Sequence, residues 1–267
     1  MAAVRPLPVV ESAAYTRPVV TRRRFVVSLP SPSRPPATER GAHPAAAPAA
    51  GATAIAAERP IDAMLIRAGL GRVRRAVDRH SAYLTALDAV LGDGDHGDNL
   101  STGFRAVELF LAELPADTPP GELLRAVGHR LVATVGGASG PLYGTAFIEA
   151  GFRAGETERL DAKTLAEMLA AAADGLARRG RCTLGDKTIL DTLRPAAEAF
   201  GVAVAEGEGS IAAWSAAINA AQAGMRSTRP LVARRGLALR LGERSAGHLD
   251  PGAVSCFHII VALAGDD

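Results

Sequence analysis

The positions of the hydrophobic residues divide the chain near residue 58. From there on, apolar side chains recur every three or four residues, the spacing of one face of an α-helix. The first such segment contains Ile61, Leu65, Val73, Val77 and Leu87. Similar segments follow at about 99–114, 121–134, 142–154, 162–178, 187–204, 210–228 and 252–264. Glycine and proline residues separate them, and none alternates as a β-strand does. The pattern predicts an all-α domain over residues 58–267, with eight helices and short connections.

Residues 1–57 lack this periodicity. Nine of the seventeen prolines lie among residues 1–50, together with seven arginines and only two acidic residues, Glu11 and Glu39. Such a composition does not bury enough apolar surface to offset the loss of chain entropy, so we expect a disordered tail over 1–57. A dispensable tail and an organelle transit peptide both have this composition, and both stay open.

Composition narrows the class of protein. Two cysteines, Cys182 and Cys256, exclude a disulfide framework and a four-cysteine zinc site. No apolar run approaches the roughly 20 residues that cross a bilayer. The chain has 28 arginines and two lysines, a bias that does not by itself indicate nucleic-acid binding. We therefore expect a cytoplasmic protein with no nucleic-acid or membrane partner.

The connection after the first predicted helix is rich in carboxylates. Asp88 precedes it, and Asp93 and Asp95 follow in a loop punctuated by glycines. Carboxylates this close repel one another unless a cation or protons intervene, and hard oxygen ligands suit Mg²⁺. Capping of the next helix explains one aspartate rather than three, and the spacing rules out an EF-hand. The loop therefore predicts a magnesium site.

Three further polar connections precede predicted helices, at 136–144, 185–188 and 242–252. The first offers backbone N–H groups and the Ser139 hydroxyl to an anion, although no Walker A sequence occurs. A plain capped turn is the alternative for this loop and for the second, where Asp191 follows Thr188 by three residues. Acidic side chains, helix N-termini and basic side chains at one end of a helical bundle together suit a Mg²⁺–nucleotide.

Four long motifs stand in register along the domain. They read Gly-Asp-Gly-Asp-His-Gly at 92–97, Gly-Gly-Ala-Ser-Gly-Pro-Leu-Tyr-Gly at 136–144, Gly-Asp-Lys-Thr at 185–188 and Gly-Glu-Arg-Ser-x-Gly-His-x-Asp-Pro-Gly at 242–252. In order and spacing, over about residues 58–267, they resemble the nucleotide-binding L subunit of dihydroxyacetone kinase. The resemblance implies an eight-helix antiparallel barrel with ADP or ATP and two Mg²⁺ ions at one rim.

The resemblance also implies the role of individual residues. It assigns coordination of the magnesium ions, and catalysis, to Asp88, Asp93 and Asp95. It assigns the contacts with the nucleotide to His96, Asn99, Ala138, Ser139, Gly180, Ile189, Asp250 and Gly252. One position departs from the family pattern, which usually has Gly-Arg-Ala-Ser before the last motif, with the arginine reaching the nucleotide. Leu237 stands at that position, and Arg234, Arg235 and Arg240 are the neighbours that remain to supply the charge.

The implied reaction is transfer of a phosphoryl group from bound ATP to dihydroxyacetone held on a separate K subunit, which this chain would need as a partner. In the family the donor is either exchanged ATP or a bound ADP re-phosphorylated by a phosphotransferase-system M subunit. Both donors stay open, although Asp98, beside the first motif, resembles the pattern of the ATP-using branch of the family. A related kinase module with a fatty-acid or other ketose acceptor, and a non-catalytic nucleotide-binding regulator, are the alternatives. The oligomeric state is left open, a homodimer included.

Overall fold

The computed structural model describes residues 60–265, so the tail expected over 1–57 lies outside the described residues. The described part folds into eight α-helices and one 3₁₀-helix, which confirms the all-α prediction. The α-helices are α1 (Ala63–Leu91), α2 (His96–Glu113), α3 (Pro120–Thr134), α4 (Ser139–Ala154), α5 (Ala162–Gly180), α6 (Leu190–Ala205), α7 (Ser210–Ser227) and α8 (Pro251–Ala264). The 3₁₀-helix η1 (Leu237–Ser245) lies between α7 and α8. None of the described helices is long and apolar enough to span a membrane.

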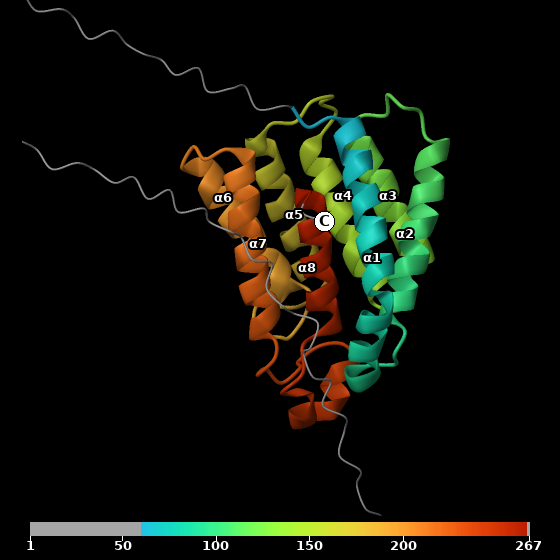
Figure 1. The fold of residues 1–267 in the computed structure, drawn as a ribbon, viewed down its shortest axis with the longest axis vertical. Helices are drawn as coiled ribbons and strands as arrows, with labels where there is room; N and C mark the ends of the chain where they lie inside the picture. The colour runs from blue at the N-terminus through green and yellow to red at the C-terminus, as the bar shows by residue number, and fades with distance from the viewer. Residues whose placement is uncertain (1–59, 266–267) are drawn as a thin grey trace, which may run out of the picture. The chain divides into compact units, whose positions relative to one another are not determined.

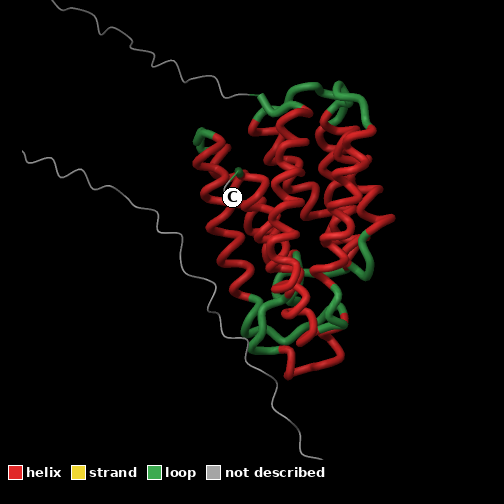
Figure 2. The backbone as a smooth tube through the Cα atoms, turned by 45° about the vertical axis from the view of Figure 1, so that its right-hand side comes forward, coloured by secondary structure: helices red, strands yellow, loops and turns green. Residues whose placement is uncertain are grey.

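The eight described α-helices form a closed antiparallel ring (Figure 1). Each helix packs against the next in the sequence, and α8 packs back against α1. Since the connections are short, the chain reverses direction at every step, and the loops gather at the two ends of the ring (Figure 2). The N-termini of α2, α4, α6 and α8 therefore share one end, the lower end in Figure 1. This end collects unpaired backbone N–H groups and the positive ends of four helix dipoles.

Aspartates mark the beginnings of three helices. The side chains of Asp62, Asp161 and Asp250 accept backbone hydrogen bonds at the starts of α1, α5 and α8. No side chain caps α4, whose N-cap residue is Ala138. Its first N–H groups therefore stay available to another acceptor.

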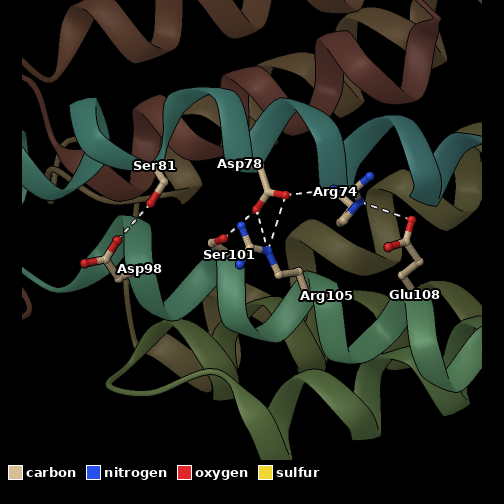
Figure 3. Close-up of polar contacts among 7 residues, drawn as sticks. All are labelled: Arg74, Asp78, Ser81, Asp98, Ser101, Arg105 and Glu108. Atoms are coloured by element: carbon tan, nitrogen blue, oxygen red, sulfur yellow. Dashed lines mark hydrogen bonds and ion pairs between the residues drawn. The ribbon is translucent and has the colours of Figure 1, made fainter.

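A polar network joins α1 to α2 at the surface (Figure 3). Asp78 of α1 accepts hydrogen bonds from Ser101 Oγ at 2.5 Å, Arg74 Nη1 at 2.8 Å and Arg105 Nε at 3.2 Å. Burial raises the pKa of Asp78, but these donors outweigh it, so the pKa lies below its usual value. Further along the same pair of helices, the Ser81 hydroxyl donates to Asp98 Oδ1 at 3.0 Å.

The helix boundaries differ from the sequence pattern mainly beside the polar loops. Helix α2 begins at His96 and α4 at Ser139, each three residues before the apolar spacing sets in. Helix α6 begins three residues later than predicted, because Lys187 has φ +65° and interrupts the helical backbone. The 3₁₀-helix was missed, since it bends at Gly242 and lacks a sustained period of 3.6 residues.

Candidate functional site

Asp88 organises the acidic loop between α1 and α2. Its Oδ2 accepts the N–H groups of Gly94, Asp95 and His96 at 3.0, 3.0 and 3.2 Å. A β-carbon on Gly92 would lie 2.3 Å from Asp88 Oδ1, so this position requires glycine. The loop is thus folded around a carboxylate in the last turn of α1.

One oxygen each of Asp88, Asp93 and Asp95 lies within 4.8 Å of the others. Asp88 is buried, and burial raises its pKa, to which the nearby charge of Asp93 adds, while the three N–H donors offset part of the rise. Asp93 and Asp95 are exposed, and Oδ1 of Asp88 accepts no hydrogen bond from the described residues. Three hard oxygen donors with unbalanced charge fit a magnesium ion, which accepts a few carboxylates and fills its shell with water and phosphate.

His96 connects the starts of α2, α4 and α8. Its Nδ1 lies 3.0 Å from Ser139 Oγ and its Nε2 lies 2.9 Å from Ser255 Oγ. Burial lowers the pKa of His96 to about 4, so the ring is neutral at pH 7. Ser255 Oγ donates to the Gly252 carbonyl at 3.0 Å, so a proton on Nε2 satisfies both imidazole contacts. This chain of hydrogen bonds fixes the Ser139 hydroxyl at the uncapped start of α4.

A second loop is folded around Asp191, in the first turn of α6. Its two carboxylate oxygens accept the N–H groups of Gly185 at 2.6 Å and Thr188 at 2.7 Å. The contact between Asp191 and Thr188 that the spacing suggests is therefore present, but Asp191 is buried where an exposed cap partner is expected. Gly185 has φ +88°, which allows the turn that brings its N–H to the carboxylate.

Lys187, in the same loop, holds distant backbone rather than facing a ligand. Its buried Nζ donates to the carbonyl oxygens of Thr228 at 2.8 Å, Leu231 at 3.2 Å and His248 at 2.5 Å. Burial lowers the pKa of Lys187 to about 8. An ammonium group has three N–H donors, so these three carbonyls use its whole capacity. The motif at 185–188 places this lysine beside a predicted nucleotide site, but the structure gives it a role in holding residues 228–248.

All eleven residues that the sequence analysis assigned line one cavity of about 370 Å³, at the end of the ring where the four helix N-termini meet. They are Asp88, Asp93, Asp95, His96, Asn99, Ala138, Ser139, Gly180, Ile189, Asp250 and Gly252. The volume is that of an ordinary small-molecule site. Burial raises the pKa of Asp250 to about 7, while the Ala253 N–H and Lys187 lower it. Which atom of a ligand each residue contacts stays a prediction.

The cavity also has walls that the motifs did not single out. Arg179 at the end of α5 and Arg235 before η1 line it, as do the apolar side chains of Leu142, Leu176 and Leu237. Arg179 and Leu176 lie outside the four motifs, so only the fold brings them to the site, whereas Leu142 belongs to the motif at 136–144. Asp98 is not among the lining residues.

The chain is similar to subunits of known kinases. Residues 90–265 match the DAK2 domain. The PEP-dependent dihydroxyacetone kinase 2, ADP-binding subunit DhaL, of Listeria innocua is 42% identical over 185 residues, 69% of this chain and 85% of that protein. The corresponding Escherichia coli subunit is 40% identical over 186 residues, with 69% and 87% covered. A D-erythrulose kinase of Mycolicibacterium smegmatis is 38% identical, but the match covers only 34% of that longer protein.

Solved structures of the dihydroxyacetone kinase of C. freundii have a matching fold. The native form superposes with a TM-score of 0.59 at 26% identity, covering 89% of this chain and 39% of that one. The complex with AMP-PNP and Mg²⁺ gives 0.57 at 27% identity, with 85% and 38% covered. This chain thus spans about two fifths of the length of those chains. The resemblance stated from the motifs is confirmed, and the chain belongs to the DAK2 domain family, the family of the DhaL subunits of dihydroxyacetone kinases.

Proposed function

We propose that this chain is the Mg²⁺- and nucleotide-binding subunit of a dihydroxyacetone (glycerone) kinase, which transfers a phosphoryl group from bound ATP to dihydroxyacetone held on a separate K subunit. The observation that carries the proposal is the convergence of three carboxylates and the uncapped start of α4 on one cavity. The relatives named as ADP-binding subunits support it, as does the fold shared with a kinase solved with AMP-PNP and Mg²⁺.

Asp88, Asp93 and Asp95 would hold the magnesium, and we expect two ions. Bound there, magnesium supplies positive charge that neutralises the nucleotide phosphates. The protein's own contribution is position. Asp88 is fixed by the loop that it organises, and the Ser139 hydroxyl by His96. Because the Ser139 hydroxyl donates its one proton to His96 Nδ1, the donors left for phosphate are the backbone N–H groups at the uncapped start of α4, which the fold holds in place.

The cavity has a polar and an apolar part, which suggests how a nucleotide lies in it. The start of α4, and magnesium held by the carboxylates, would suit the phosphates. The base then falls against the apolar wall around Gly180, where a β-carbon would come within 3.2 Å of Leu142 and 3.1 Å of Cys182. A side chain at Gly180 would therefore narrow the space for the base.

The donor and the acceptor need a direct assay. Relatives are named as PEP-dependent or PTS-dependent subunits, and others as erythrulose kinases. Asp98 supports neither donor, because it is bonded to Ser81 and does not line the cavity. The assay therefore mixes the chain with a K subunit and dihydroxyacetone, and supplies either ATP or a phosphorylated M subunit as the phosphoryl donor. A parallel series uses erythrulose in place of dihydroxyacetone.

The expected results separate the proposal from its alternatives. Calorimetry should detect Mg-ADP binding to the purified chain, and phosphorylated dihydroxyacetone should form in the ATP arm. Product that forms only with the phosphorylated M subunit would identify that subunit, and not ATP, as the phosphoryl donor. Product that forms only with another acceptor would indicate a related kinase. Binding without product in any arm would favour a regulatory protein. Absence of Mg-ADP and Mg-ATP binding would overturn the proposal.

A further inference from the structure

Positive charge in the cavity wall is scarce. Among the described residues, the lining cations are Arg179, Lys187 and Arg235, while four aspartates face the same space. Lys187 has no N–H left for a ligand, because three carbonyls engage its ammonium group. A polyphosphate in this cavity therefore has two arginines within reach besides metal ions and backbone N–H groups.

The two arginines differ in how they are held. Arg235 Nε donates to Asp186 Oδ2 at 3.2 Å, and Asp186 is only 4% exposed. The Thr183 N–H fixes the same oxygen at 3.0 Å, and the Arg234 N–H donates to the Asp186 carbonyl at 3.1 Å. No side chain among those described orients the exposed guanidinium of Arg179 in this way.

An arginine anchored through Nε keeps its terminal amino groups for another acceptor. The guanidinium is a planar fork that binds phosphate with two parallel hydrogen bonds. The Arg235 side chain is 47% exposed, so the anchored group is open to the cavity. Gly236 follows with φ +65° and turns the chain, and Leu237 then contributes only apolar surface to the wall.

We infer that Arg235 contacts the phosphate chain of the bound nucleotide, with Asp186 as its positioning residue. The inference rests on the proposed function, since it concerns the nucleotide of that site. Arg235 then supplies the cation that Leu237 lacks, from a position two residues earlier in the chain. Arg234 is the matched control, because it is the neighbouring arginine, is exposed and does not line the cavity.

The test is calorimetry of Arg235→Gln and Arg234→Gln with Mg-ADP and with adenosine, which has no phosphates. Loss of a charge-assisted hydrogen bond predicts ~10- to 100-fold weaker Mg-ADP binding for Arg235→Gln. Adenosine affinity should stay within about twofold, since nothing is removed beside the base. Arg234→Gln should match the wild type with both ligands.

Arg235→Lys guards against a folding defect, because lysine keeps the charge beside Asp186 without the planar fork. If circular dichroism shows Arg235→Gln to be unfolded, Arg235→Lys should still lose Mg-ADP affinity selectively. Equal losses for both ligands would reveal a purely structural role for Arg235, and unchanged Mg-ADP affinity would mean that it makes no contact; either result overturns the inference. If the wild type itself binds no nucleotide, the proposed function fails, and the inference fails with it.

Discussion

Two buried aspartates perform the same task at the residue scale. Asp88 closes the loop after α1, and Asp191 closes the loop before α6, each by accepting backbone N–H groups from a glycine-rich turn. These hydrogen bonds compensate for the burial of the two carboxylates. The loops that line the cavity are therefore shaped by side chains of the adjoining helices, which leaves Asp93 and Asp95 exposed to a ligand.

The magnesium assignment predicts a selective effect of Asp93→Asn. Removing one of three carboxylates should weaken Mg-ADP binding at least ~10-fold, about 1.4 kcal/mol, in calorimetry. Helix content in circular dichroism should not change, because Asp93 is exposed. Asp98→Asn is the matched control, since Asp98 lies five residues away but outside the cavity. Equal affinities of Asp93→Asn and the wild type would refute the metal assignment.

The sequence was sufficient to find the residues of the cavity but not all of their partners. Most of the eleven assigned residues lie in or beside motifs with their own chemical character, whereas Gly180 is assigned only through the family resemblance, and all of them line one space. The partners of Lys187 lie 41 to 61 residues further along the chain. No local pattern marks a backbone carbonyl as a partner, so this role becomes visible only when the ring is folded. The pairing of Arg235 with Asp186, 49 residues apart, was hidden for the same reason.

At the scale of elements, α3 and α4 pack through reciprocal glycines. A β-carbon on Gly128 would lie 2.6 Å from the Gly144 carbonyl, and one on Gly144 would lie 2.7 Å from the Gly128 carbonyl. Gly121 and Gly151 form a second such pair, about two helical turns away. The backbones of these two helices are therefore in direct contact, which holds the start of α4 in place.

This contact reverses the usual effect of replacing glycine by alanine in a helix. At an open position the replacement stabilises by about 0.5–1 kcal/mol. Gly128→Ala should instead destabilise by about 1–3 kcal/mol, because the new methyl group overlaps α4. Gly201→Ala in α6 is the control, with no atom within 4 Å of its β-carbon, and should be neutral or stabilising. Urea unfolding of both variants decides, and a stabilised Gly128→Ala would contradict the close contact.

Periodicity was a good guide to the elements, because most of the helices bury one apolar face, although α8 is buried on nearly every side. It predicted the helix ends beside the site less accurately, because capping and backbone conformation determine where those helices begin. Lys187, with its positive φ, delays α6 although the apolar spacing continues through it. Leu237 and Leu239 of η1 are 40% and 55% exposed, so no pattern of buried residues in the sequence indicates that helix.

At the scale of the whole chain, the described residues 60–265 belong to one compact unit. Deletion of residues 1–55 should therefore leave the melting temperature and Mg-ADP affinity of the remaining chain nearly unchanged. Calorimetry on the shortened and the full-length protein provides both measurements. A large fall in either quantity would mean that the deleted residues contribute to the fold or to the site.

The ring closes where α8 meets α1, and this seam contains a stacked pair of histidines. The rings of His80 and His258 lie 3.7 Å apart between centroids, at an interplanar angle of 15°. Burial, with the nearby charges of His80 and Arg79, lowers the pKa of His258 to about 3. The unfolded chain binds this proton with a pKa near 6.5, so acid favours unfolding between about pH 6.5 and 3.

The seam therefore predicts how stability changes with pH. Between pH 7 and pH 5, His258 alone should remove about 2 kcal/mol from the free energy of unfolding. In His258→Phe, which keeps an aromatic ring against His80, the fall over this interval should be smaller by about that amount. Urea unfolding at the two pH values measures the difference, and comparison with the wild type cancels the contributions of His96 and Asp250. The exposed His129, replaced by glutamine, should leave the wild-type difference intact. An equal fall in His258→Phe and the wild type would show that His258 takes up its proton as readily in the folded ring as in the unfolded chain.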